Sequence, residues 1–135
     1  MTQLPDTTDL ILDKQGSVLT IWLNRPAAKN ALSAEMVDEL SAVLDATRED
    51  RGLRTIILRG KGGFFCAGGD ISSMDIDSTL AGRERMRRTH KLVRLMAKGG
   101  KPIVAAVEGW AAGAGMAVAC ACDVIVAAED ARFTA

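Results

Sequence analysis

Residues 56–71 read IILRGKGGFFCAGGDI, and residues 103–116 read IVAAVEGWAAGAGM. Each stretch begins with an apolar run that is typical of a buried strand. Each then continues into a turn made largely of glycine and alanine, which leads toward a predicted helix. Because these residues carry so little side chain, a ligand can touch the backbone of the turn itself. The two stretches therefore decide the predicted fold and locate the candidate site.

The rest of the chain repeats the order of strand, small-residue turn and helix, which indicates an α/β fold with parallel pairing. We predict strands at residues 10–12, 18–23, 55–58, 103–107 and 124–127, and helices at residues 34–48, 82–97 and 113–120. Ser33 is the expected N-cap of the first helix. In the second helix, Met86, Val93 and Met96 are expected to face inward, after a polar loop over residues 75–81.

Two further expectations concern the strands and the ends of the chain. A turn at residues 14–16 joins the first two strands, and the apolar runs at 55–58 and 124–127 are expected to be buried. Another element begins at residues 132–134, yet the chain stops at Ala135 without a closing helix. We therefore interpret residues 1–135 as one domain that is a piece of a longer protein.

Composition restricts the class of protein. Hydrophobic residues make up 48% of the 135 residues and charged residues 25%, which favours a packed core over disorder. Basic and acidic residues both number 17, so nothing suggests a nucleic-acid or anionic-membrane partner. The first residues lack a signal-peptide pattern, and the longest apolar stretch, near residues 109–122, is too short to span a bilayer comfortably. We expect a cytoplasmic protein.

The three cysteines, Cys66, Cys120 and Cys122, argue against a disulfide framework because their number is odd and two of them lie only two positions apart. A metal pair at Cys120 and Cys122 would need a neighbouring histidine or carboxylate cluster, which the sequence lacks. We expect buried free thiols and no metal.

The turns themselves suggest a chemistry. A turn that opens a helix leaves N–H groups free to point at a negative oxygen. Two such turns can aim two N–H groups at one carbonyl, which is the layout of an oxyanion hole. Asp70 stands where a carboxylate would cap the following helix and orient the Gly69 N–H. The alternative is that each turn is an ordinary connection between a strand and a helix.

Other motifs fit less well. A dinucleotide fingerprint beginning at Gly113 would need its third glycine at Val118, and neither turn is followed by the Gly-Lys-Ser/Thr of a Walker A loop. His90 is the only histidine, and we expect it to pack on the helix face of Met86 and Val93 rather than to act as a base. No Gly-x-Ser-x-Gly elbow is present. The arginine-rich run 83–88 is interpreted as a solvated face, with a phosphate-bearing ligand or a neighbouring subunit as alternatives.

Five segments together resemble a known family. They are residues 23–26 (LNRP), 30–32 (NAL), 65–71 (FCAGGDI), 109–116 (GWAAGAGM) and 122–124 (CDV). In this order they resemble the enoyl-CoA hydratase/isomerase (crotonase) superfamily, over nearly the whole chain but only about the N-terminal half of a typical member. The resemblance implies a crotonase-type spiral of repeated ββα units, a homotrimer or hexamer, and an acyl-CoA thioester substrate. Coenzyme A belongs to that substrate, and no separate cofactor is implied.

The resemblance also implies roles for individual residues. The N–H groups of Gly69 and Ala114 would stabilise the enolate-like oxygen of the thioester. The coenzyme A part of the substrate would be held by backbone at the positions Ala28, Ala67, Gly68, Asp70, Ile71 and Ser72. Arg25 and Lys29 would be neighbours of its phosphates, although each can equally be a surface charge.

One departure from the family pattern affects the expected reaction. Hydratases of this family carry two catalytic glutamates, and the first corresponds to Ala117, which cannot hold a proton. The second would lie beyond Ala135. We therefore expect an enoyl-CoA double-bond isomerase. The alternatives are an enoyl-CoA hydratase, a dehalogenase or hydrolase on the same frame, a catalytically silent acyl-CoA-binding subunit, and a fragment that is inactive by itself.

Overall fold

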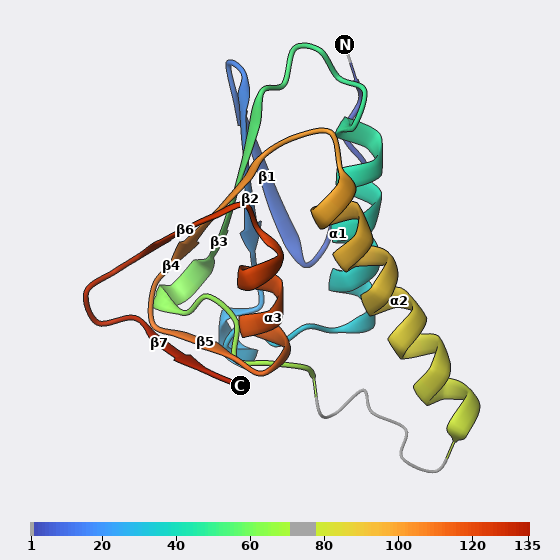
Figure 1. Cartoon of the computed structure of the whole chain (residues 1–135), viewed down its shortest axis with the longest axis vertical. Coiled ribbons are helices and arrows are strands. Elements are labelled where there is room, and N and C mark those ends of the chain that lie inside the picture. Colours follow the sequence, from blue (N-terminus) through green and yellow to red (C-terminus); the bar gives the residue numbers. More distant parts are fainter. Residues whose placement is uncertain (1, 71–77) are drawn as a thin grey trace.

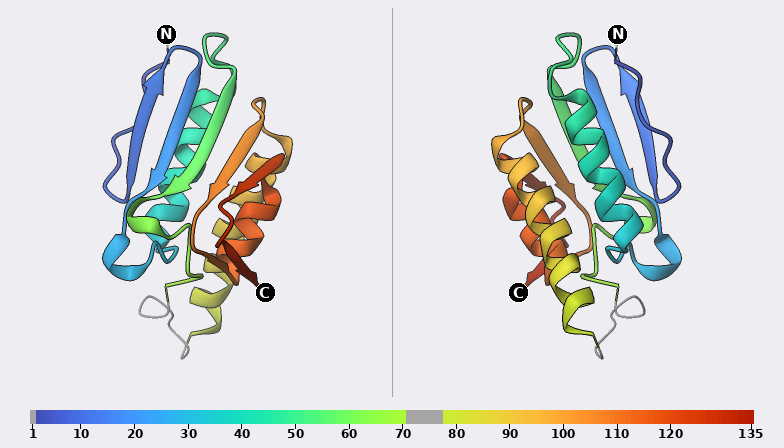
Figure 2. Two further views of the ribbon diagram at one scale, coloured as in Figure 1. Left: turned by 90° about the vertical axis from the view of Figure 1, so that its left-hand side faces the viewer. Right: turned by 90° about the vertical axis from the view of Figure 1, so that its right-hand side faces the viewer.

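A five-stranded sheet with helices on one face forms the body of the molecule (Figures 1 and 2). The computed structural model describes residues 2–70 and 78–135. Its elements are β1 (Leu10–Gln15), β2 (Val18–Leu23), η1 (Pro26–Ala28), α1 (Ala34–Thr47), β3 (Thr55–Gly60), η2 (Lys61–Gly63), α2 (Thr79–Lys98), β4 (Ile103–Val107), β5 (Trp110–Ala112), α3 (Ala114–Ala121), β6 (Val124–Ala127) and β7 (Arg132–Thr134). The predicted α/β class is confirmed.

The main sheet has the strand order β1-β2-β3-β4-β6. β1 pairs antiparallel with β2 through a short hairpin, and every other pair in this sheet is parallel. Parallel neighbours need a crossover connection, and the helices between the strands supply it. The parallel pairing predicted from the alternation of strands and helices is therefore confirmed.

The core lies between the sheet and the helices. Ser33 caps α1 as predicted, accepting a hydrogen bond from the Met36 N–H at 3.1 Å. The apolar stripe of α1 is buried, and it packs against alternate residues of β2 and β3. Its buried apolar members are Met36, Val37, Leu40, Val43 and Leu44. Burying each such side chain stabilises the fold by about 1.5–3 kcal/mol.

A second, smaller sheet gives the fold its repeat. β5 and β7 pair in parallel, and an isolated parallel bridge joins Cys66 to Ala111 in β5. Each strand of the main sheet from β3 onward is thus followed by a short extended segment that belongs to the smaller layer. Helices α2 and α3 then follow the first two of these segments. The loose internal repeat of strand, small-residue turn and helix seen in the sequence corresponds to these units.

Asn30 pins the loop after β2 to the end of β3. It is fully buried and adopts a left-handed conformation with φ 58°. Its side-chain oxygen accepts from the Arg25 N–H at 2.8 Å, and its amide donates to the Lys61 and Phe64 carbonyls at 2.9 and 2.8 Å. One asparagine therefore satisfies three backbone groups from two segments that are distant in sequence.

The second helix differs from its prediction. α2 begins at Thr79 with Ser78 as its N-cap, so residues 79–81 are helical rather than part of a polar loop. Met86 is 57% exposed and His90 is also exposed, so both were wrongly placed in the interior. The reason is that the N-terminal half of α2 extends past the sheet, and only its C-terminal half, with Leu92 and Met96, reaches the core (Figure 1).

Two strand predictions also need correction. β1 continues to Gln15, which moves the hairpin turn to residues 16–17, because Gly16 supplies the positive φ (60°) that the turn requires. β6 was expected to be buried, but it is exposed along its length. It forms an edge of the main sheet, and its only partner among the described strands is β4.

We expect Asn30→Ala to lower the free energy of unfolding by about 2–4 kcal/mol, because each buried polar group left without a partner costs roughly 1–3 kcal/mol. Urea unfolding measures this. Asn24→Ala is the matched control, since the Asn24 side chain makes no hydrogen bond within the described residues. It should change stability by less than about 0.5 kcal/mol. Equal losses for the two variants would contradict the role of Asn30.

Candidate functional site

The first glycine-rich turn presents the Gly69 amide on one side of the chain. The Leu32 N–H donates to the Gly68 carbonyl at 2.8 Å, and the Asp70 N–H donates to the Leu32 carbonyl at 3.1 Å. In this parallel bridge the Gly68 carbonyl and the Asp70 N–H both point toward Leu32. The Gly69 N–H belongs to the same peptide group as the Gly68 carbonyl and lies opposite to it, so this N–H points away from Leu32. Within residues 2–70 and 78–135 that N–H meets no acceptor.

The second turn ends in a helix whose first amides face outward from its N-terminus. Gly113 precedes α3 with φ 53° and ψ −119°, and no side chain caps the helix. The Ala117 N–H makes the first hydrogen bond of the helix, to the Gly113 carbonyl at 3.1 Å. The amides of Ala114, Gly115 and Met116 come before that bond and have no carbonyl within the helix to accept from them.

Backbone pairing brings the two turns together. The Cys66 N–H donates to the Trp110 carbonyl and the Ala112 N–H donates to the Cys66 carbonyl, both at 3.0 Å. Gly69 and Ala114 each lie three positions beyond the bridged residues Cys66 and Ala111. The paired segments therefore deliver both turns to the same end of the smaller sheet.

Gly115 allows the helix to approach the first turn closely. A Cβ added at this position would lie 2.3 Å from the Cys66 carbonyl oxygen and 2.8 Å from the Cys66 Cβ. Only glycine fits against this backbone without moving α3 or the strand. The close contact at Gly115 keeps the N-terminus of α3, and with it Ala114, next to the segment that leads to Gly69.

A cleft of about 750 Å³ opens beside these turns, and Gly69, Asp70 and Ala114 all line it. Its walls come from the first turn of α1 and from one side of α2. His90 is among the α2 residues on this wall, whereas the sequence predicted that it packs on the helix face of Met86 and Val93. Gly69 and Ala114, the two residues whose amides are predicted to form an oxyanion hole, thus line one cavity.

The other sequence-predicted positions are distributed around this cleft. Ala28 lies in η1, and Ala67 is exposed with its N–H donating to the Lys29 carbonyl at 3.0 Å. Neither lines the cleft, and Gly68 is buried behind it. Ile71 and Ser72 lie outside the described residues. Among the expected positions for coenzyme A, the cleft wall contains Asp70.

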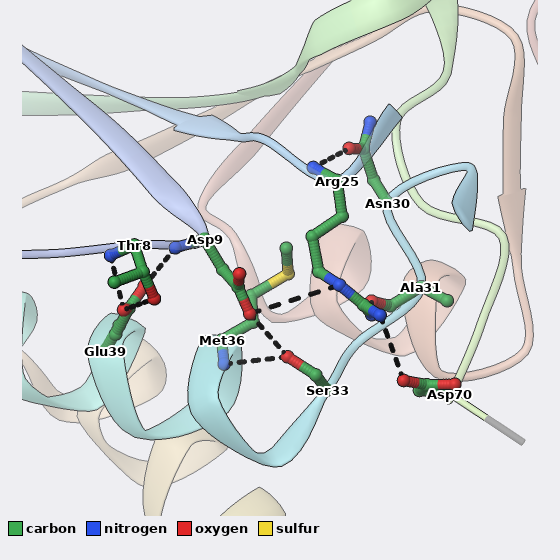
Figure 3. Close-up of polar contacts among 9 residues, drawn as sticks. All are labelled: Thr8, Asp9, Arg25, Asn30, Ala31, Ser33, Met36, Glu39 and Asp70. Carbon is green, nitrogen blue, oxygen red and sulfur yellow. Dashed lines mark hydrogen bonds and ion pairs between the residues drawn. The ribbon is translucent and has the colours of Figure 1, made fainter. Parts of the chain in front are cut away.

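Two charged residues of the predicted site contact each other. The helix that Asp70 is predicted to cap would begin within residues 71–77, which lie outside the described residues, so this capping role stays a prediction. The Asp70 carboxylate accepts from Arg25 Nη2 at 3.1 Å (Figure 3). The Arg25 guanidinium faces Asp70, the Ala31 carbonyl and Asp9, and a role beside phosphates stays a prediction.

No local sequence pattern predicts the ion pair of Arg25 and Asp70, because 45 positions separate the two residues. The other expected phosphate neighbour, Lys29, is exposed and places its ammonium 5.5 Å from the centre of the Phe64 ring.

The three cysteines differ in burial. Cys66 is buried as expected, but Cys120 is exposed and Cys122 is half-buried. Burial raises the pKa of the Cys66 thiol, and burial together with the Asp123 carboxylate raises the pKa of Cys122 to about 12. In the described part of the chain, no cluster of histidine, cysteine, aspartate or glutamate is arranged to hold a metal ion. No helix described there is long and apolar enough to cross a membrane.

Comparison with known proteins identifies the family. Residues 13–135 match the family model described as Enoyl-CoA hydratase/isomerase. The chain belongs to this family. It is 40% identical over 126 residues to 2,3-dehydroadipyl-CoA hydratase of Escherichia coli (strain K12), covering 93% of this chain and 49% of that protein. It is 38% identical over 120 residues to 1,2-epoxyphenylacetyl-CoA isomerase of the same organism, covering 86% and 46%.

Solved structures support the same assignment. The fold matches Pseudomonas aeruginosa AtuE with a TM-score of 0.90 and 43% identity, over 93% of this chain and 50% of that chain. The crotonase fold expected from the motifs is therefore confirmed. The chain spans about half the length of the relatives that it matches.

The contact between α3 and Cys66 predicts that Gly115→Ala lowers the free energy of unfolding by about 1–3 kcal/mol, the usual cost of overpacking. Gly82→Ala in α2 is the matched control, because a Cβ there meets nothing within 4 Å. It should leave stability unchanged or raise it by up to about 1 kcal/mol, since alanine is the better helix former. Chemical denaturation of both variants measures the difference, and equal stabilities would refute the close approach.

Proposed function

We propose that the protein containing this chain binds an acyl-CoA thioester and stabilises its enolate, with the N–H groups of Gly69 and Ala114 donating to the thioester oxygen. The observation that carries the proposal is that both residues line one cleft while neither amide is engaged within the described secondary structure. Membership of the enoyl-CoA hydratase/isomerase family supports the class of substrate.

The two amides would act where charge develops. When a proton leaves the carbon next to the thioester carbonyl, the electron pair moves onto the carbonyl oxygen. Donors that are already oriented toward that oxygen lower the barrier without reorganising, and losing one such donor costs about 3–4 kcal/mol. Backbone amides at a helix N-terminus suit this task because the helix dipole also favours negative charge there.

For the reaction, we favour migration of a double bond. A base removes a proton from C2 of a 3-enoyl thioester, the enolate delocalises to C4, and return of the proton to C4 gives the 2-enoyl thioester. This sequence needs one acid–base group, which is expected beyond Ala135. Ala117 supports it because alanine, at the position implied for the first glutamate of hydratases, can neither accept nor donate a proton.

Hydration is the second candidate, favoured by the relatives that are named as hydratases. In that reaction water adds its oxygen to C3 and a proton to C2 of a 2-enoyl thioester. A catalytically silent acyl-CoA-binding subunit is the third candidate, again because of Ala117. Assembly as a homotrimer or hexamer, and the backbone cradle for coenzyme A at positions 28 and 67–72, remain predictions.

Incubation of the full-length protein with 3-enoyl-CoA and with 2-enoyl-CoA tests the reaction. We expect 3-enoyl-CoA to convert to 2-enoyl-CoA, which is followed by the absorbance of the conjugated thioester. Rapid formation of 3-hydroxyacyl-CoA from 2-enoyl-CoA without migration would establish hydration instead. Binding of both thioesters without turnover would identify the silent subunit.

Replacing Ala114 with proline tests the backbone donor directly. Ala114 is the first residue of α3, where proline is tolerated because no helical hydrogen bond uses that N–H. We expect Ala114→Pro to lower kcat by about 10²–10³-fold with the fold retained. Thr79→Pro places proline at the same position of α2, at a residue that does not itself line the cleft, and should keep full activity. An active Ala114→Pro variant would exclude this amide as a donor.

A further inference from the structure

The amide of Gly69 depends on a flexible piece of backbone. Gly68 and Gly69 are adjacent, and Gly68 has φ 126°, a conformation that residues with side chains rarely adopt. Two successive glycines have many accessible conformations, so their sequence does not fix the direction of the Gly69 N–H. Leu32 holds this turn through its hydrogen bonds to the Gly68 carbonyl and the Asp70 N–H, so whatever fixes this bridge also fixes the Gly69 N–H.

Arg25 contacts both segments of this bridge. Its Nη2 donates to Asp70 Oδ2 at 3.1 Å, next to Gly69, and its Nη1 donates to the carbonyl of Ala31, next to Leu32 (Figure 3). Leu32 and Gly69 are the bridged pair. The planar guanidinium of Arg25 therefore links the two segments that form the bridge, at the residue next to each bridged position.

The ion pair of Arg25 and Asp70 is partly buried and connected to the rest of the fold. The Arg25 side chain is 23% exposed and that of Asp70 is 14% exposed. The Arg25 backbone N–H is held by Asn30, and its Nε lies 4.0 Å from Asp9 Oδ2. Asp9 in turn accepts from the Ser33 hydroxyl at 2.8 Å, and Ser33 caps α1 at the edge of the cleft. Arg25 thus has a fixed origin from which to position Asp70.

Charge gives the pair a second consequence. Asp70 lines the same cleft as Gly69 and Ala114. A carboxylate without a cation there would oppose a negative charge forming on a nearby oxygen, and a close cation cancels most of that field.

We propose that Arg25 is a positioning residue: through Asp70 it fixes the direction of the Gly69 N–H and neutralises the carboxylate beside it, and it does not bind the phosphates of coenzyme A. The inference rests on the proposed function of the cleft. It adds a residue whose side chain touches neither the thioester nor the reacting carbons. A residue of this kind should change the rate of reaction rather than the affinity for substrate.

The test uses the full-length protein and four variants: Arg25→Gln, Arg25→Lys, Asp70→Asn and the Arg25→Gln/Asp70→Asn double variant. We expect Arg25→Gln to lower kcat about tenfold to hundredfold, as small misplacements of reacting groups do. KM for the enoyl-CoA and the Kd of free coenzyme A should not change. The losses in the double variant should be less than additive, because both substitutions remove the contact that Arg25 and Asp70 share. Arg25→Lys should recover part of kcat, since it restores the charge but not the fork.

Glu108→Gln is the matched control. It breaks the ion pair of Arg59 and Glu108, at 2.9 Å, which lies outside the cleft lining. Its kcat should equal that of the wild-type protein. Thermal unfolding of every variant separates loss of rate from loss of fold. If Arg25→Gln does not fold, Asp70→Asn replaces it in the test, because this single substitution should also lower kcat.

The outcomes separate this inference from the proposed function. A wild-type protein that turns over no enoyl-CoA overturns the proposed function, and the role of Arg25 falls with it. An active wild-type protein whose Arg25→Gln variant keeps its kcat, or loses affinity for free coenzyme A instead, overturns the role of Arg25 alone. Independent, additive losses in the double variant would also overturn it.

Discussion

The parallel pairing of Cys66 with Ala111 is the constraint on which the rest of the cleft depends. Two hydrogen bonds of 3.0 Å hold these segments in register, and the glycine at position 115 lets α3 touch the same backbone. Gly69 and Ala114 each lie three positions beyond this bridged pair, so the register of the bridge brings the two residues close together. A shift of register by one residue would point the chain's groups to the opposite face and separate the two amides.

A second layer of polar contacts holds the other side of the cleft. Glu39 of α1 accepts from the backbone of Thr8 and Asp9 at 2.7 and 3.0 Å, and Asp9 reaches both Ser33 and Arg25 (Figure 3). These bonds attach the N-terminal segment to the N-cap and the second turn of α1. They hold the α1 wall of the cleft against the N-terminal segment. The N-terminal half of α2, which forms the opposite wall, extends past the sheet. The two walls therefore differ in how much of the fold supports them.

The apolar surface of this chain is unevenly covered. The apolar stripe of α1 and alternate residues of β2 and β3 are buried, while Val124, Ile125 and Val126 of β6 are 53%, 40% and 60% exposed. The chain spans about half the length of its relatives. Burial of a strand depends on what lies on both of its sides, so a strand composition that fits an interior can still lie at an edge.

Much of the architecture was determined by the sequence alone, because local patterns carried it. The apolar stripe and Ser33 fixed α1, the run at residues 103–107 matched β4 residue for residue, and the repeated strand and turn indicated parallel pairing. The two glycine-rich turns were located by a local signal, small residues after a buried strand, whereas the roles of Gly69 and Ala114 came from the resemblance to the family. The tertiary structure alone decided what each side chain meets. It turned His90 and Met86 outward, placed β6 at an edge and paired Arg25 with Asp70 across 45 positions. Periodicity describes one element at a time, whereas burial and ion pairing depend on elements that the chain brings together only when it folds.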